Sequence, residues 1–480
     1  MRARIFAEEN RQWWTLAAVA VALFMVMLDN TVVNVALPSM ERDLHISVSS
    51  LEWVVSGYAL SFAVLMLTGG KLGDMYGRRL IFVIGLGIFT VSSLACGLAD
   101  SSAMLVGARV VQGVGAALMM PATLSIISAT FPPRLRGTAI GIWAGVSALA
   151  LAIGPLVGGI IVKHASWSWI FYINVPIGLA GIVAALVIIR ESRDTSHEQR
   201  LDLPGLVTSA IGLLALTFAL IESNRYGWGS AVIIGLFAVA AVSLAAFVLV
   251  ELKQRLPMFD LQLFRNRTFV GANTVALLVT LAMFGVFFFI SLFMQQVLGY
   301  SPVQTGAAFL PMTILIILIA PLSGRASDRI GSRWLMAGGM SLLGISLLIY
   351  AQLDTSSSFW NILPGLVIGG LGMALVMTPM TAAAMSAVPV DKAGVGSGML
   401  NTFRQLGGAL GIAVMGAILT NRAASESHGG ASRVEAFTTG LNEALYVAAA
   451  IAFVGAAVAA VVVRSHAAQR SEQPTVVEAA

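Results

Sequence analysis

Long apolar stretches without charges alternate with short polar segments along the whole chain. Each stretch is close to the roughly 20 residues that an α-helix needs to cross the hydrocarbon core of a bilayer. Charges, prolines and glycines bound these stretches, so the pattern predicts an all-α polytopic membrane protein with fourteen transmembrane helices. The expected spans are 13–38, 51–70, 80–99, 103–130, 137–163, 169–190, 204–222, 230–251, 268–297, 304–323, 335–353, 360–387, 394–420 and 440–463.

The positions of Lys and Arg orient these spans. Apart from Arg109 and Arg404, which lie inside spans, 21 of these residues fall in the termini and the even-numbered loops, and five fall on the opposite side. Positive residues are retained on the cytoplasmic side of a membrane. We therefore expect a multi-pass protein of the cell (inner or cytoplasmic) membrane with both termini in the cytoplasm.

Composition agrees with a membrane protein and excludes several other classes. Hydrophobic residues make up 58% of the chain and charged residues 11%, whereas roughly a quarter of a soluble domain is charged. The net charge of +5 comes from basic residues between the apolar stretches, so nucleic acid is not an expected partner. Cys96 is the single cysteine and the five histidines are scattered, so neither a disulfide framework nor a metal site is predicted.

Missing motifs argue against an ATP-driven pump and against an intramembrane enzyme. A Walker A loop needs Gly-Lys-[Ser/Thr], and none of the four lysines stands in that context. No H-E-x-x-H motif occurs either. No cofactor is therefore expected, and the proton gradient remains as the energy source.

Two pairs of short motifs repeat at about half the length of the chain. GKLGDMYGRR (70–79) matches GRASDRIGSR (324–333), and PPRLRGTAIG (132–141) resembles PVDKAGVGSG (389–398). Such parallel repeats occur in transporters, where two halves enclose a cavity that opens to either side in turn; they favour alternating access over a channel. The predicted organisation is a cytoplasmic N-terminus (1–12), a six-helix bundle (13–190), an inserted helix pair (191–251), a cytoplasmic linker (252–267), a second six-helix bundle (268–463) and a cytoplasmic tail (464–480).

A carboxylate lies inside the first span. The apolar run from Trp13 to Leu28 is only sixteen residues long, so the helix must also include Asp29. An intramembrane carboxylate costs about 3 kcal/mol at the bilayer centre and is functional by default. A group that is charged in one state and neutral in another can couple proton flow to a conformational change. The alternative is an Asp that caps a broken helix or bonds a neighbouring helix.

Two arginines also lie inside predicted spans. A cation such as Arg109 close to Asp29 would favour the charged carboxylate, although the sequence does not place the two side by side. The alternative is an arginine that snorkels to the cytoplasmic surface. Arg404 and its neighbour Gln405 lie deep in the span 394–420, so they must face protein or a watery cavity. Lining the cavity and joining the two halves are both open for Arg404.

The repeated loop motif is expected to form a gate and not to touch substrate. Its glycines suit a tight helix–loop–helix, and its charges can pair with charges or helix ends across the interface between the halves. These contacts would exist in the outward-facing state and break in the inward-facing state. A basic loop that only sets topology is the alternative. The expected gate residues are Gly70, Asp74, Gly77, Arg78, Arg79, Asp328 and Arg333.

Small residues and polar residues mark two further features. The stretch GPLVGG places Gly154, Pro155, Gly158 and Gly159 in the fifth span, where GxxxG spacing permits close helix approach and the proline bends the span. Polar residues within spans are the candidates for lining a cavity or binding substrate, ahead of the phenylalanines near residue 288, which more often face lipid. These candidates are Asn34, Gln112, Gln295, Gln296, Arg404 and Gln405.

Four segments resemble signatures of a known family. The loop 70–79 resembles the signature between helices 2 and 3 of the major facilitator superfamily, and LDNTVVNVALP (28–38), ARVVQGVGAALMMP (108–121) and GPLVGG (154–159) resemble three more. With fourteen spans, the chain resembles the fourteen-helix drug:proton antiporter family of the multidrug efflux type. The resemblance implies the major facilitator fold, with two six-helix bundles plus two inserted central helices.

The resemblance also implies a function. It suggests proton-coupled export of small hydrophobic, often cationic, drugs, with antibiotic resistance as the outcome. It further implies that Arg109 takes part in proton coupling with Asp29, and that the bend at Pro155 seals the cavity against proton leak. The alternative is a dedicated exporter of one endogenous lipid, antibiotic or metabolite. A monomer is expected, because the GxxxG pairs also serve packing within one chain.

Overall fold

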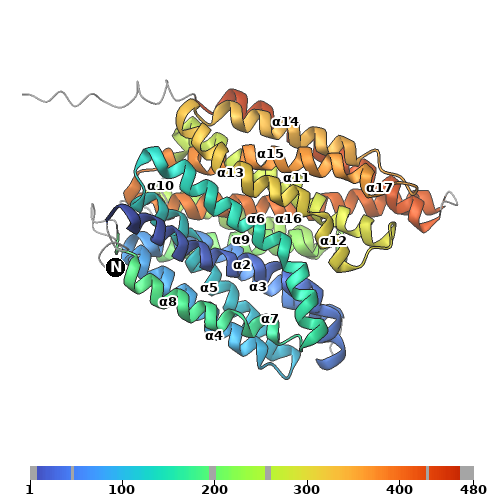
Figure 1. The fold of residues 1–480 in the computed structure, drawn as a ribbon, viewed down its shortest axis with the longest axis horizontal. Coiled ribbons are helices and arrows are strands. Elements are labelled where there is room, and N and C mark those ends of the chain that lie inside the picture. Colours follow the sequence, from blue (N-terminus) through green and yellow to red (C-terminus); the bar gives the residue numbers. More distant parts are fainter. Residues whose placement is uncertain (1–7, 45–47, 194–201, 255–260, 429–431, 465–480) are drawn as a thin grey trace, which may run out of the picture.

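The structure is a computed structural model that describes residues 8–44, 48–193, 202–254, 261–428 and 432–464. Within these ranges the chain forms helices and no strands. Most of the helices run along the long axis of the molecule (Figure 1). The early helices, in blue and green, lie in the lower part of this view, and the late helices, in yellow to red, lie in the upper part.

The helices follow one another with short connections. The first group is α2 (Glu8–Leu44), α3 (Val48–Tyr76), α4 (Arg78–Gly97), α5 (Ser102–Thr130), α6 (Pro133–His164), α7 (Trp169–Tyr172) and α8 (Asn174–Ile188). The middle pair is α9 (Leu203–Tyr226) and α10 (Ala231–Lys253). The last group is η1 (Leu261–Arg265), α11 (Arg267–Gln296), α12 (Pro302–Ala308), α13 (Leu310–Ile330), α14 (Arg333–Tyr350), α15 (Phe359–Ser386), η2 (Val390–Lys392), α16 (Ala393–His428) and α17 (Arg433–Val462).

Twelve helices in the described part of the chain are long and apolar enough to cross a membrane. The two other predicted spans fall on α6, with 32 residues, and α11, with 30 residues. Every predicted span thus coincides with helix, whereas the count of fourteen crossings stays a prediction. Several helices extend past the predicted ends, among them α2 to Leu44 and α16 to His428. The helix α3 continues to Tyr76 and α13 to Ile330 because most of the repeated motif is helical and not loop.

Helices of each group pack mainly within that group. In the first group α2 packs against α6 and α8, and in the last group α11 packs against α16. The most extensive contacts between the groups are those of α3 with α16 and of α6 with α13. The predicted repeat makes these two pairs equivalent. The helices α3 and α13 carry the repeated motif of residues 70–79 and 324–333, and α6 and α16 begin within the repeated motif of residues 132–141 and 389–398. The helix α9 packs against α10, α3 and α16, so the middle pair lies beside this junction.

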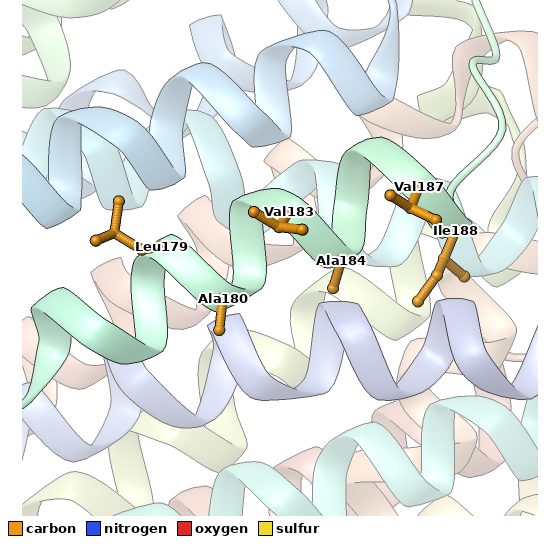
Figure 2. Close-up of a pocket in the computed structure, with 6 residues that line it drawn as sticks. All are labelled: Leu179, Ala180, Val183, Ala184, Val187 and Ile188. Carbon is orange, nitrogen blue, oxygen red and sulfur yellow. The ribbon is translucent and has the colours of Figure 1, made fainter.

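The outer face of α8 carries a shallow apolar groove (Figure 2). Leu179, Val183 and Val187 are more than half exposed, whereas Ala180 and Ala184 point toward the neighbouring helix in this view. Exposed apolar side chains on a membrane helix match the acyl chains of the bilayer. We therefore assign this groove to the lipid-facing surface. Its lining residues are Leu179, Ala180, Val183, Ala184, Val187 and Ile188.

Candidate functional site

Asp29 and Arg109 form a buried ion pair between α2 and α5. Arg109 Nη1 lies 2.5 Å from Asp29 Oδ2, and each side chain is only 1% exposed. The snorkelling alternative for Arg109 is therefore wrong, because its guanidinium points inward to a carboxylate. A buried ion pair offsets the loss of hydration only when its remaining polar atoms are also bonded.

Neighbouring groups bond those remaining atoms. Gln112 Nε2 donates to Asp29 Oδ1 at 3.2 Å, while its Oε1 accepts from Arg109 Nη1 at 2.7 Å. Asn174 Nδ2 of α8 donates to the same carboxylate oxygen at 3.4 Å. Arg109 Nε donates to the backbone oxygen of Val54 at 3.0 Å. Both carboxylate oxygens thus have hydrogen-bond donors, and these donors come from two helices, α5 and α8.

Aromatic rings close the site against water. The Tyr58 ring lies 4.1 Å from Arg109 Cζ, and the Phe171 ring lies 5.8 Å from it. Both rings are at most 1% exposed. A cation over a desolvated ring gains about 2 kcal/mol, which adds to the ion pair. We define Asp29, Arg109, Gln112, Asn174 and Tyr58 as the coupling site.

A glycine permits the helix contact that builds this site. Gly113 follows Gln112 on α5 and lies against the backbone of α3 at Tyr58. A Cβ at Gly113 would lie 2.5 Å from the Tyr58 carbonyl oxygen, closer than any side chain tolerates. The absent side chain lets α3 and α5 approach, which brings the Tyr58 ring over Arg109.

Two members of the coupling site, Asn174 and Tyr58, were not predicted from the sequence. Asn174 is a polar residue inside the apolar stretch 169–190, and this contrast is a signal of a buried polar site. Tyr58 carries no such signal, since a tyrosine in a membrane span is ordinary. The structure also moves Gln112, predicted as a cavity candidate, into the coupling site, where it is fully buried.

At the helix ends predicted to be cytoplasmic, Asp74 of α3 binds the first residues of α16. Asp74 Oδ1 accepts the backbone N–H of Gly394, and Oδ2 accepts that of Val395, both at 2.9 Å. The first N–H groups of a helix lack partners within the helix and carry the positive end of its dipole. The Asp74 carboxylate, from the other half of the chain, accepts hydrogen bonds from these N–H groups and places a negative charge at the positive end of the dipole.

Arg78 strengthens this contact. Its Nε and Nη2 donate to Asp74 Oδ1 at 3.1 and 2.9 Å. Its Nη2 also donates to the carbonyl oxygens of Val390 and Asp391, the latter at 3.1 Å. Arg78 and Asp74 are each 2% exposed. We call Asp74, Arg78 and Gly394 the first latch.

The second half of the chain repeats this contact in the opposite direction. Asp328 Oδ1 of α13 accepts the backbone N–H of Gly137, near the start of α6, at 3.2 Å. Ser332 stands at the position equivalent to Arg78, and its hydroxyl lies 2.7 Å from that of Ser327. We call Asp328 and Gly137 the second latch.

Paired glycines bring the backbones together at both latches. A Cβ at Gly137 would lie 2.6 Å from the Gly324 carbonyl oxygen, and Gly70 lies equally tightly against Gly394. The two motifs that repeat in the sequence therefore bind each other crosswise. Because both latches lie at helix ends predicted to be cytoplasmic, the halves are in contact on that side.

Three predicted gate residues, Arg79, Gly77 and Arg333, make their contacts within their own half of the chain. Arg79 was expected to reach across the interface, which is wrong: its Nη1 donates to Ile189 O at 3.2 Å within its own half. Gly77 makes the turn between α3 and α4 at a φ of 118°, a conformation that favours glycine. Glu191 then accepts the backbone N–H of Arg79 at 3.0 Å and so caps α4. Arg333 lies over the Trp334 ring at 4.8 Å, on its own helix.

The predicted cavity candidates are spread over the molecule. Gln295 donates to Ser291 Oγ at 3.1 Å and Gln296 is exposed, both at the C-terminal end of α11. Arg404 and Gln405 are half-buried on α16, and Arg404 Cζ lies 5.9 Å from the Trp143 ring of α6. The Asn34 side chain lies outside the described part of the structure.

The glycines of the fifth span pack α6 against α2 beside Asp29. Gly154 lies against Thr31, and a Cβ at Gly158 would lie 3.1 Å from Val32 O. Gly159 instead faces Val303 of the second half. The helix α6 is continuous through these residues; the Pro155 side chain lies outside the description, so the bend stays a prediction.

The chain is similar to known proteins in sequence and in fold. The family model for the Major Facilitator Superfamily matches residues 19–412. The tetracenomycin C resistance and export protein of Streptomyces glaucescens is 38% identical over 413 residues, covering 86% of this chain and 77% of that protein. The multidrug resistance protein Stp of Mycobacterium tuberculosis is 38% identical over 411 residues, covering 85% and 76%. The puromycin resistance protein pur8 of Streptomyces alboniger is 36% identical over 422 residues, covering 87% and 84%.

Solved structures agree in fold alone. The human organic anion transporter MFSD10 superposes with a TM-score of 0.67 at 14% identity, covering 93% of this chain and 99% of that one. The proton:xylose symporter XylE, bound to 6-bromo-6-deoxy-D-glucose, superposes with a TM-score of 0.69 at 13% identity, covering 96% and 97%.

Proposed function

Because this chain belongs to the major facilitator superfamily, we propose that it is a proton-coupled antiporter that exports hydrophobic drugs by alternating access. Its relatives are multidrug and antibiotic resistance exporters, and such a multi-pass protein resides in the bacterial cell membrane. Members of this family are transporters and not enzymes. The proton gradient is the proposed energy source, and no cofactor is required.

The observation that carries the proposal is the sealed ion pair between Asp29 and Arg109. Protonation of Asp29 would remove the charge that Arg109 binds and leave a buried guanidinium without a counter-ion. Removing one partner of a buried pair is strongly destabilising, by about 3–5 kcal/mol. That free energy is large enough to change the packing of α2 against α5 during the transport cycle. Proton arrival and conformational change are thereby linked.

The two latches supply the conformational side of the cycle. With both latches formed, the cytoplasmic ends of α3 and α16, and of α13 and α6, are held together. Drug entry from the cytoplasm requires these contacts to break. We propose that the structure is the cytoplasm-closed state, and that protonation of Asp29, which breaks its ion pair with Arg109, opens the latches.

A carboxylate inside the membrane, such as Asp29, is also a possible binding group for a cationic drug. In this conformation both Asp29 oxygens are bonded to protein groups and the side chain is buried. A cationic drug could bind there only after Arg109 withdraws. We therefore assign Asp29 to proton coupling, while a preference for cationic cargo stays a prediction.

A dedicated exporter is the second candidate function. Several relatives are named for one antibiotic, such as tetracenomycin C, puromycin and methylenomycin A, whereas others are named as multidrug proteins. We propose a monomer in either case, because the GxxxG glycines are used within the chain. Gly141 and Gly145 face Ala320 and Ile317 of α13.

A survival panel separates the two candidates. A pump-deficient bacterial strain that expresses this chain is exposed to structurally unrelated antibiotics and dyes, with and without a protonophore. Protection against several unrelated compounds, lost with the protonophore, supports a multidrug antiporter. Protection against one compound supports the dedicated exporter, and protection that survives the protonophore contradicts proton coupling.

A further inference from the structure

Arg404 is an intramembrane cation without a counter-ion among the described residues. Its guanidinium makes no ion pair and no hydrogen bond in the part of the chain that the structure describes; its one interaction is the Trp143 ring at 5.9 Å. Arg404 is mostly but not fully buried, so a minor part of it faces space that protein does not fill. Arg109, the other intramembrane arginine, has a carboxylate, an amide and a carbonyl as partners.

The lack of hydrogen-bond partners at Arg404 among the described residues, in contrast to Arg109, argues against a purely structural role for Arg404. A charge in the membrane interior is expensive unless it is paired. A guanidinium offers five N–H donors in a planar fork that matches a carboxylate. The Arg404 contact with Trp143 is at the long limit for a cation over a ring and uses none of those donors. An arginine that only joined the two halves would donate hydrogen bonds from these N–H groups to the other half.

The surroundings of Arg404 come from both halves of the chain. Trp143 lies on α6 and is 2% exposed; its Nε1 donates to Thr123 Oγ1 of α5 at 3.1 Å. This bond fixes the indole plane. Arg404 approaches that ring from α16, in the other half. The pair therefore lies between the halves, where cargo passes in an alternating-access transporter.

A polar face of α16 extends from Arg404 to the first latch. Asn401 and Ser397 precede Arg404 by three and seven residues, a spacing that places all three on one side of a helix. The Ser397 hydroxyl is fully buried and has no hydrogen-bond partner among the described residues. Gly394 of the first latch is one turn further toward the cytoplasm. Polar groups thus continue from the cytoplasmic gate to Arg404.

We propose that Arg404 and Trp143 form a binding site for aromatic cargo that carries one anionic group. The guanidinium binds the carboxylate or sulfonate in a bidentate manner. The indole, which is buried in this cytoplasm-closed conformation, packs against the aromatic body when the halves separate. The inference rests on the proposed export function and names a cargo class for it. An anionic cargo differs from a cationic cargo bound by Asp29. Both carboxylate oxygens of Asp29 are already bonded to protein groups of the coupling site.

Binding to the purified protein tests this site without any proton gradient. The probes are 1-pyrenebutyrate, which is anionic at pH 7.5, and 1-pyrenebutanol, its neutral analogue of the same shape. The wild-type protein in detergent should bind the acid about tenfold more tightly than the alcohol. The variant Arg404→Gln should bind both equally, and Arg404→Lys should retain part of the preference because it keeps the charge.

The alcohol is the control for folding, since its affinity should change less than about twofold in the Arg404 variants. The variant Trp143→Leu should weaken both probes alike because it removes the ring and not the charge. Equal affinities of the wild-type protein for acid and alcohol would overturn the proposal. An acid preference that persists in Arg404→Gln would overturn it as well.

Transport separates this inference from the proposed function. If the chain is not a proton-driven exporter, efflux fails for every compound while acid binding at Arg404 is retained. If only the inference is wrong, Arg404→Gln exports a cationic dye and an aromatic acid as well as the wild type does. A structural strut would instead lower export of both compounds together.

Discussion

Asp74 and Gly394 bind each other at 2.9 Å although 320 residues separate them in the chain. The contact joins the end of α3 to the start of α16, and Asp328 with Gly137 repeats it between α13 and α6. In each latch a carboxylate of one half binds helix N–H groups of the other. Two symmetric contacts of this kind can close the cytoplasmic side without any residue touching cargo.

The first prediction concerns the strength of the first latch. Asp74→Asn keeps the size of the side chain but removes the charge that Arg78 and two backbone N–H groups bind. Hydrogen bonds to charged groups contribute about 1.5–3 kcal/mol each, so the closed state should lose at least about tenfold in population. Cytoplasmic maleimide labelling of Ser397→Cys, in a Cys96→Ser background, should become correspondingly faster.

Asp328→Asn is the matched comparison. Ser332 replaces the arginine beside this carboxylate, so the increase in labelling should be smaller than for Asp74→Asn. Equal labelling rates of wild type and Asp74→Asn would contradict a role of the first latch in closure.

The second prediction concerns backbone contact. Gly394→Ala would place a Cβ on the Gly70 backbone, so α3 and α16 must separate for the side chain to fit. Dye export should fall at least about tenfold, because the closed state loses its close approach. Gly338→Ala on α14 is the control, since nothing lies within 4 Å of its Cβ position. Export by Gly394→Ala at the rate of Gly338→Ala would be inconsistent with this packing.

The third prediction concerns Glu191, which caps α4 through the backbone N–H groups of Arg79 and Leu80 at 3.0 and 3.1 Å. Glu191→Ala should lower the stability of the purified protein by about 1 kcal/mol, as loss of a helix cap does. Because the cap lies within one half, the transport rate per folded molecule should be unchanged. Thermal unfolding and dye export, normalised to protein in the membrane, measure the two effects. A selective loss of export would place Glu191 in the gate instead.

The fourth prediction follows from an anionic cargo at Arg404. For the same number of protons, exporting a monovalent anion moves two more charges than exporting a monovalent cation. Each charge contributes about 2.3 kcal/mol per 100 mV of membrane potential. Collapsing the potential with valinomycin and potassium should therefore slow export of 1-pyrenesulfonate more than export of ethidium in everted vesicles. Equal slowing would contradict export of the anion in its charged form.

Helix positions were predictable because a bilayer demands long apolar stretches. Asp29, Arg109, Asp74 and Arg404 stood out as charges or repeats. The pairing of the repeated motifs was not predicted, because aligning Gly137 with Gly394 identifies equivalent positions and says nothing about which residues touch.

The other contacts that the sequence did not predict also depend on how the helices pack. Asn174 and Tyr58 reach Asp29 from α8 and α3, and only the packing of the helices brings them there. Arg79 lies next to Arg78 in the sequence, yet the helical turn directs it to Ile189 in its own half. Adjacent residues of one motif can thus serve different contacts.

The coupling role of Asp29 is the central claim, and Asp29→Asn in proteoliposomes tests it most directly. The amide keeps the shape but neither binds Arg109 as a charge nor takes up a proton. We predict that a pH gradient no longer drives uphill transport, with a loss of at least about tenfold, while drug binding and Asp43→Asn, an exposed control on α2, stay near wild type. Uphill, gradient-driven transport by Asp29→Asn at the wild-type rate would contradict the account.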